Sequence, residues 1–267
     1  MALLGRAPRQ DGPPRAGQSL QAAYSQRYGA WISARRRAAG LSALWWGPAI
    51  VAVSIVAGVS THFPFFGLVY FVLAVAAVVD VLFRRPDALV RVQARAHAES
   101  ETGKLLRSVQ IRGKATVLHD RMMTRTDSPF EVEHLVICPR GAFLIDSKQW
   151  HGRGVRIFGK DMYVDHVDQG PMLVQMVANA RRLGEALTAV AGHDEEVGIV
   201  TVQPVLAVHA DALTGTPRNM QGVTVVIPEQ LAPMLRAPDA RWSSSAVDSL
   251  VKAADELLVN KDAAGAH

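Results

Sequence analysis

The stretch from residue 41 to residue 83 constrains the fold more than any other feature of this sequence. It contains no Lys or Arg and only one acidic residue. A short turn-like segment at 60–64 divides it into two apolar runs, 44–59 and 65–83. Because a helix of about 20 apolar residues spans the core of a bilayer, these runs are typical of membrane helices. We therefore expect a two-helix transmembrane hairpin over residues 41–85.

Arginines flank this hairpin at both outer ends, and none lies in the turn between its helices. Because cytoplasmic flanks carry an excess of Lys and Arg, we expect both termini to be cytoplasmic. The alternative is a helical hairpin buried in a soluble core, but such a hairpin normally shows polar residues on one face. The flanking residues are Arg35, Arg36 and Arg37 before the hairpin, and Arg84, Arg85 and Arg91 after it.

The distribution of charge separates the N-terminal segment from the rest of the chain. The formal net charge is +5, yet residues 1–40 hold seven arginines and a single acid, so the remainder is close to neutral. A basic chain often indicates a nucleic-acid partner. Here the surplus lies beside the apolar stretch, where it favours contact with anionic lipid head groups of the bilayer. We expect residues 1–40 to form a basic, flexible cytoplasmic arm, since Gly, Pro, Gln and Arg give it no core.

Residues 86–267 predict a mixture of helices and strands. A single cysteine, Cys138, excludes an internal disulfide framework and therefore a secreted disulfide scaffold. The order of the elements predicts an α/β fold with a mixed sheet flanked by helices. We expect a main domain at 86–230 and a C-terminal helical extension at 231–267. The expected helices are 89–106, 172–190 and 243–259; the expected strands are 115–119, 131–138, 142–148, 154–158, 162–166, 197–208 and 223–227.

The register of the central hairpin follows from its turn. Cys138-Pro139-Arg140-Gly141 fits a four-residue turn with Pro second and Gly fourth, which pairs Cys138 with Gly141. Counting back places Glu133 opposite Asp146 and Glu131 opposite Lys148. Because side chains alternate along a strand, four polar residues share one face, namely Glu131, Glu133, Asp146 and Lys148. The other face then holds Val132, Val136, Phe143 and Ile145.

Two interpretations of this polar face remain open. Carboxylates are the ligands that Mg²⁺ prefers, and a bound ion with a nearby ammonium suits the hydrolysis of phosphate esters. A cross-strand ladder of surface salt bridges uses the same residues and contributes little to stability.

The region from about Ala94 to Val164 resembles the NERD family, the nuclease-related domain, with weaker likeness to about Pro228. The resemblance implies a restriction-endonuclease-like fold of the PD-(D/E)xK type, and the apolar stretch at 41–85 fits bacterial members that carry a membrane hairpin upstream. The matching elements are Glu99 with Thr102, Leu105 and Leu106; Val117-Leu-His-Asp120; Val132-Glu-His134; and Gly141-Ala-Phe-Leu-Ile-Asp-Ser-Lys148 with Trp150 and Gly152.

Carried over to this sequence, the resemblance implies that Glu99, Glu133 and Asp146 hold a divalent ion, Mg²⁺ or Mn²⁺, and that Lys148 assists the attacking water. Glu101 is an alternative to Glu99. Glu133 stands where the family usually has Asp, and the small residues usual around Glu99 are replaced by Arg95, His97 and Ala98.

The expected function is therefore that of a nuclease anchored in the bacterial cell membrane by two helices, with its main domain cytoplasmic and DNA or RNA as substrate. The alternative is a catalytically degenerate, membrane-tethered binding or scaffold module on the same fold. The near-neutral domain favours the alternative, since nucleic-acid affinity relies on basic surfaces that neutralise phosphates.

Overall fold

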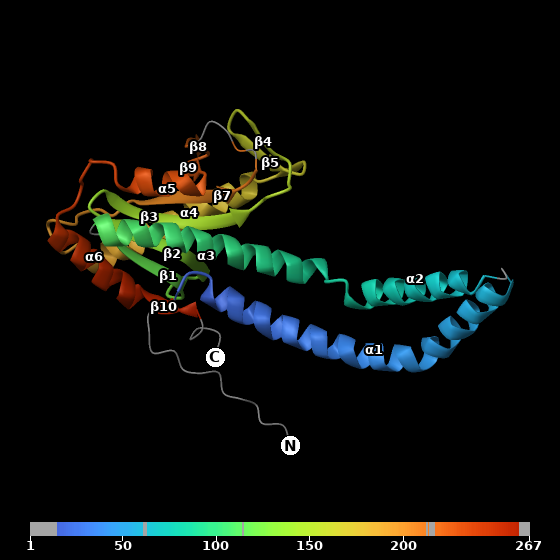
Figure 1. The fold of residues 1–267 in the computed structure, drawn as a ribbon. Coiled ribbons are helices and arrows are strands. Elements are labelled where there is room, and N and C mark those ends of the chain that lie inside the picture. Colours follow the sequence, from blue (N-terminus) through green and yellow to red (C-terminus); the bar gives the residue numbers. More distant parts are fainter. Residues whose placement is uncertain (1–14, 61–62, 114, 212, 214–216, 262–267) are drawn as a thin grey trace, which may run out of the picture. The chain divides into compact units, whose positions relative to one another are not determined.

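The computed structural model describes residues 15–60, 63–113, 115–211, 213 and 217–261 (Figure 1). These residues divide into two compact units. One is Gln21–Gln93, and the other consists of the described parts of Met1–Leu20 and Ala94–His267.

The first unit consists of helices. It contains most of α1 (Gln18–Ser60), all of α2 (Pro64–Phe83) and the beginning of α3 (Asp87–Gly113). Among the described residues, Phe65–Phe83 is the one helix long and apolar enough to cross a membrane, and a second span exists only if the two parts of α1, bent by 51°, count as one. Only 6% of the apolar window of α2 is buried among the described residues.

The expected flexible arm at residues 1–40 needs correction. Residues 18–40 belong to α1, while residues 1–14 lie outside the described part of the chain. The helix is supported by an aromatic series at helical spacing, in which the rings of Tyr24 and Tyr28 stack at 5.8 Å and Trp31 follows at 5.7 Å. Alanines at many of the intervening positions add helix propensity.

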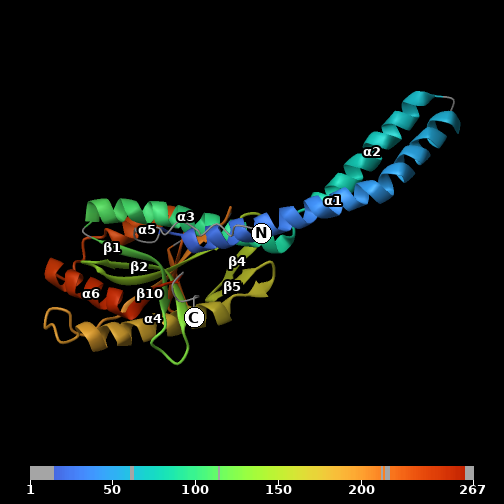
Figure 2. The same cartoon turned by 90° about the horizontal axis from the view of Figure 1, so that it is seen from below.

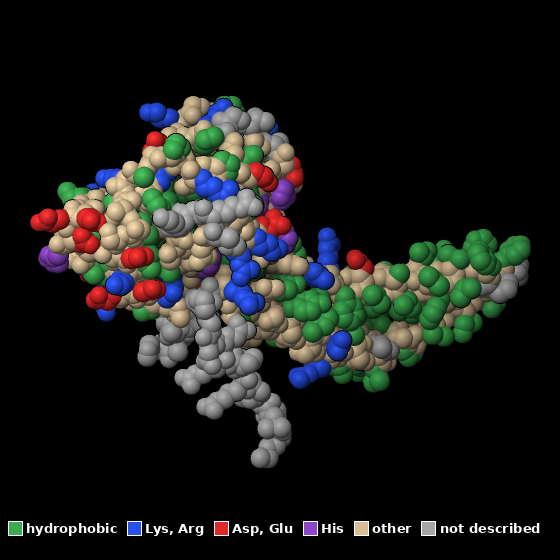
Figure 3. Space-filling model, turned by 60° about the vertical axis from the view of Figure 1, so that its left-hand side comes forward, with side chains coloured by type: hydrophobic (Ala, Val, Ile, Leu, Met, Phe, Trp, Pro, Cys, Tyr) green, Lys and Arg blue, Asp and Glu red, His purple; other side chains and the backbone are tan. Residues whose placement is uncertain are grey.

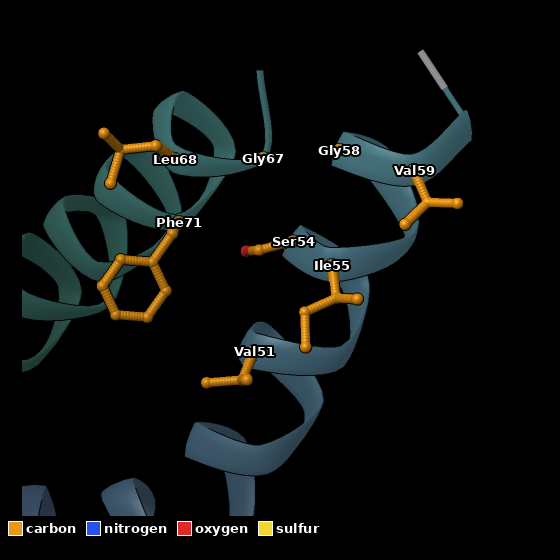
Figure 4. A pocket seen from close by; sticks show the side chains of 8 residues that line it. All are labelled: Val51, Ser54, Ile55, Gly58, Val59, Gly67, Leu68 and Phe71. Atoms are coloured by element: carbon orange, nitrogen blue, oxygen red, sulfur yellow. The ribbon is translucent and has the colours of Figure 1, made fainter. Parts of the chain in front are cut away.

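α1 and α2 approach each other closely at two glycines. A Cβ atom added to Gly67 would lie 2.6 Å from the carbonyl oxygen of Ser54 and 3.3 Å from the Cα of Gly58. Small residues permit such close contact between helix backbones. An apolar groove opens beside this contact, with Val51, Ile55 and Phe71 among its lining residues (Figure 4).

The second unit is built around a mixed seven-stranded sheet with the order β10-β1-β2-β3-β7-β9-β8. The strands β1, β2 and β3 are antiparallel, whereas β7 runs parallel to β3 and β9 runs parallel to β7. The expected mixed α/β sheet is thereby confirmed. The strands are β1 (Thr116–Met123), β2 (Phe130–Cys138), β3 (Gly141–Gln149), β7 (Val202–His209), β8 (Arg218–Met220), β9 (Val223–Val226) and β10 (Leu258–Asn260).

Helices cover both faces of this sheet (Figure 2). On one face lie α3 and α5 (Pro228–Leu235), whose buried Leu106 and Leu231 share a core with Phe143. On the other lie α4 (Gly170–Ala191) and α6 (Ser244–Leu257), whose Leu183 and Leu250 share a core with Leu144. A separate small sheet consists of β4 (Val155–Phe158), β5 (Asp161–Val164) and β6 (Val167–Asp168).

The expected C-terminal extension at 231–267 also needs correction, because its described residues are part of the second unit. Ser243 caps α6, its side chain accepting a hydrogen bond from the Ala246 backbone N–H. Leu250 and Ala254 are fully buried in the core with α4, and β10 pairs with the edge of β1. Residues 262–267 lie outside the described chain.

The register of the central hairpin is confirmed. Cys138 pairs with Gly141, and the ladder continues to the pair of His134 and Ile145, where its hydrogen-bonded pairs end. Beyond that point the backbone N–H of Ser147 donates instead to the Glu133 carboxylate at 2.8 Å.

The expected alternation along β2 is wrong at one point. Val132 shares a core with Leu135 on the α4–α6 side, although strict alternation places it with Val136 on the α3 side. The cause lies in β1, where Asp120, opposite Glu133 in register, has a left-handed φ of 50° that interrupts the ladder. This break turns Glu133 toward α3.

Candidate functional site

Glu99 is positioned by the buried stripe of α3. Thr102, Leu106 and Val109 follow it at helical spacing, and all are almost completely buried. Glu99 is fully buried as well, and its Oε1 accepts a hydrogen bond from Arg95 Nε at 3.1 Å. Its Oε2 is buried without a hydrogen-bond partner among the described residues. A carboxylate oxygen in this state is available to a ligand.

The interruption of the β1–β2 ladder at Asp120 is accompanied by two further carboxylates close to Glu99. Ligand oxygens of Glu99, Glu131 and Glu133 lie within 4.8 Å of one another. We call these three residues the acidic cluster. Three carboxylates at this spacing have the donor chemistry and the reach that a hard divalent cation requires, and the unpartnered oxygen of Glu99 fits the same role.

The guanidinium of Arg95 lies among the carboxylates of the acidic cluster. Besides its bond to Glu99, its Nη2 lies 2.7 Å from Glu133 and 3.3 Å from Glu131. Burial opposes its charge, but the carboxylates raise the pKa of Arg95 above its usual value, with Glu133 contributing most. A second cation, Lys261, bonds the other oxygen of Glu131.

Asp146 and Lys148 lie next to the cluster as an ion pair. Lys148 Nζ contacts both carboxylate oxygens of Asp146, at 2.7 and 2.6 Å, and lies 3.8 Å from Glu133. Burial opposes the ionisation of Asp146, but Lys148 and a hydrogen bond with Glu133 lower its pKa. Burial also opposes the charge of Lys148, yet Asp146 and Glu133 raise its pKa, so the pair stays ionised.

The pKa values of Glu99 and Glu133 are raised, in contrast to that of Asp146. Burial raises the pKa of Glu99 to about 7, even though Arg95 lowers it. Burial, reinforced by the nearby Asp146, raises the pKa of Glu133 well above its usual value. The site therefore contains more carboxylates than its neighbouring cations, Arg95, Lys148 and Lys261, keep ionised at neutral pH.

This site lies within the part of the chain that a known family describes. Residues 94–209 match the family model of the nuclease-related domain, NERD. No curated protein and no solved structure matches the chain.

The NERD match covers the chain from α3 to the end of β7. It contains the four expected site residues and also Arg95 and Glu131. The match ends before α5, α6 and β10, although these elements complete the same sheet and core.

The structure brings the expected residues of the NERD region together, but Glu131 has other partners than expected. Glu133 contacts Arg95 of α3 and lies beside Asp146 and Lys148. Glu131 was expected opposite Lys148, but it contacts Arg95 and Lys261 instead. The proposed ladder of cross-strand surface salt bridges is therefore replaced by a largely buried network.

Glu101, the alternative to Glu99, belongs to a different group of side chains. Its carboxylate lies 3.7 Å from His97 Nε2 and 3.6 Å from His209 Nδ1. Arg95 belongs to the site, but its contacts with the carboxylates were not predicted from the sequence. The signal was its position four residues before Glu99, the spacing at which side chains meet on a helix.

Further polar groups lie close to the site. His119 and His134 contact each other through their Nδ1 atoms at 2.9 Å, and burial lowers their pKa values to about 4 and about 3. Asp120 binds Ser19 through both the backbone N–H and the hydroxyl, at 3.3 and 3.1 Å. This contact holds the left-handed Asp120 at the break in the ladder.

Proposed function

We propose that this protein is a membrane-anchored, divalent-metal-dependent hydrolase of phosphodiester bonds in nucleic acid. The observation that carries the proposal is the convergence of Glu99, Glu133, Asp146 and Lys148 within a region that matches the nuclease-related domain. Glu99 and Glu133 supply buried carboxylates for Mg²⁺ or Mn²⁺, and Asp146 lies within hydrogen-bonding distance of Glu133.

The chain's own residues divide the work. A bound divalent ion would activate water and stabilise charge on the phosphate. Asp146 holds the Lys148 ammonium in place at 2.6 Å. The Lys148 side chain is 25% exposed, so its ammonium is accessible to the attacking water as a charged hydrogen-bond donor. The Ser147 backbone N–H fixes the Glu133 carboxylate, so that its remaining oxygen points toward Arg95 and the acidic cluster.

The membrane part of the proposal is supported by the first unit. Apolar side chains cover the visible surface of the paired helices (Figure 3). Trp45 and Trp46 of α1 are 79% and 63% exposed. A surface of this kind requires either a bilayer or a protein partner. The arginines outside both ends favour a hairpin in the bacterial cell membrane, with both termini and the second unit in the cytoplasm.

The test uses the full chain in detergent micelles, with DNA and RNA substrates and either Mg²⁺ or Mn²⁺. We expect cleavage that Lys148→Ala reduces by at least about a hundredfold, the usual range for loss of a group stabilising developing charge. Lys252→Ala removes an exposed lysine of α6 and should cleave like the wild type. An inert wild-type protein, or a Lys148→Ala variant of equal activity, contradicts the proposal.

A second candidate is a non-catalytic module that keeps the fold and binds a partner. The specific observation in its favour is that Arg95 already supplies a cation to the acidic cluster. This candidate predicts neither cleavage nor metal binding by the wild-type chain at millimolar Mn²⁺.

A further inference from the structure

We propose that Arg95 and a divalent ion compete for the same three carboxylates, so that Arg95 holds the site when no metal is bound and withdraws when the ion enters. Glu131, which no sequence argument assigned to the metal, then becomes one of its ligands. This inference deepens the proposed function and rests on it for the presence of a metal site.

Arg95 and a divalent ion need the same space. Mg²⁺ binds carboxylate oxygens at about 2.0–2.1 Å. Oxygens of Glu99, Glu131 and Glu133 lie within 4.8 Å of one another, and nitrogens of one guanidinium already contact all three residues at 3.1, 3.3 and 2.7 Å. An ion that bridges these carboxylates occupies the volume that the guanidinium fills.

Arg95 leaves one carboxylate oxygen of the site without a hydrogen bond. Glu99 Oε2 is buried and has no hydrogen-bond partner among the described residues, because the guanidinium reaches only Oε1. A buried acceptor in this state is unfavourable. An ion among the three carboxylates can take this oxygen as a ligand, which gives metal binding an advantage over the guanidinium.

The Arg95 side chain is freer to move than the two buried carboxylates. The side chains of Glu99 and Glu133 are only 1% and 5% exposed, whereas that of Arg95 is 41% exposed. A long arginine side chain with an open route to solvent can turn away from α3 without rearrangement of the sheet. Lys261 bonds the other oxygen of Glu131 and can remain in place during the exchange.

The experiment is calorimetric titration of Mn²⁺ into the full chain in detergent micelles at pH 8. We expect Arg95→Gln to bind Mn²⁺ at least about tenfold more tightly than the wild type, since it removes the competing charge. Arg107→Gln is the matched control: it removes an exposed arginine from the same helix, about 18 Å along its axis. It should bind like the wild type.

The role of Glu131 is tested in the same titration. Adding Glu131→Gln to Arg95→Gln should lower Mn²⁺ affinity by at least about tenfold, because it removes one ligand. Equal affinities of wild type and Arg95→Gln overturn the competition, and equal affinities of the single and double variants overturn the assignment of Glu131.

Two measurements distinguish competition at the metal site from effects of the substitutions on folding and on catalysis. If Arg95→Gln melts without metal, Mn²⁺ but not Na⁺ should restore its thermal transition, and failure to do so contradicts the proposal. Arg95→Lys should give an intermediate Mn²⁺ affinity, because it keeps the charge but loses the planar fork. If Arg95→Gln binds Mn²⁺ more tightly but no cleavage occurs, the competition is supported and the proposed nuclease is contradicted. If the wild type cleaves with metal but Arg95→Gln has unchanged Mn²⁺ affinity, the nuclease is supported and the competition is contradicted.

Discussion

At the scale of single residues, burial is the main influence on the acidity of Glu99. Burial raises its pKa to about 7, whereas an unfolded glutamate has a pKa near 4.5. Because the folded state holds the proton more tightly, the contribution of Glu99 to stability falls as the pH rises from about 4.5 to about 7. A metal ligand must be deprotonated, so the same shift opposes metal binding below neutral pH.

We therefore predict that Mn²⁺ affinity increases as the pH rises from 6 to 8. Below the pKa of about 7, each unit of pH should weaken binding by up to about tenfold, because the ion must displace a proton from Glu99. Calorimetric titration of the full chain at several pH values measures this dependence. Glu101→Gln should preserve it, whereas Glu99→Gln should both weaken binding and flatten the profile. An affinity that is independent of pH contradicts this role of Glu99.

At the scale of elements, the contact between β1 and β2 depends on two neutral histidines. Burial lowers the pKa values of His119 and His134 to about 4 and about 3, compared with 6.5 for an exposed histidine. Since the unfolded chain takes up protons first as the pH falls, the stability that these residues contribute is present above pH 6.5 and is lost at lower pH.

We predict that the free energy of unfolding falls as the pH is lowered from 6.5 to 4. Each unit of pKa shift corresponds to about 1.4 kcal/mol, so His119→Gln should make unfolding less sensitive to pH by up to about 3 kcal/mol over this range. Denaturant unfolding followed by circular dichroism measures the difference. His193→Gln replaces an exposed histidine and should retain the wild-type slope; an unchanged slope in His119→Gln would show that the pair does not titrate in this range.

Local chemistry explains how much of these elements could be predicted. The Pro-Arg-Gly turn fixed the pairing of β2 with β3, because a turn type sets the register. The left-handed Asp120 gave no signal, since aspartate adopts this conformation only when its surroundings favour it, here through Ser19, about a hundred residues away in sequence. Alternation alone therefore assigned Val132 to the wrong core.

The site was predictable in its residues but less so in its contacts. Glu133, Asp146 and Lys148 follow from the strand pattern and the family resemblance. Glu131 and Lys261 meet only because β10 returns to the edge of β1, a contact across 130 positions that no local pattern encodes. The resemblance also ended before α6 and β10, so it gave no reason to include them in the domain.

At the scale of the whole molecule, the chain separates an apolar helical unit from a mixed α/β unit. The excess of positive charge belongs to residues 1–40, and the rest of the chain is close to neutral. This arrangement favours a role for the arginines in membrane orientation rather than in binding nucleic acid.

We predict the corresponding topology from cysteine labelling in intact bacterial cells. Cys138 is the one cysteine of the sequence, and it is buried, so Cys138→Ala provides a background for single introduced thiols. Ser60→Cys, at the end of α1, should react with a membrane-impermeant maleimide added outside. Asp127→Cys, exposed between β1 and β2, should react only after permeabilisation. Labelling of Asp127→Cys in intact cells would contradict a cytoplasmic domain.

The three residues of β10 also have a consequence for the handling of the protein. They cover the outer side of β1, which would otherwise present unpaired backbone groups to any other chain with a free strand. The ammonium of Lys261 follows directly and reaches Glu131. A fusion or truncation that displaces β10 would expose the edge of β1 to pairing with other chains, and it would also remove the Lys261 ammonium from Glu131. Aggregation and altered metal affinity should therefore appear together.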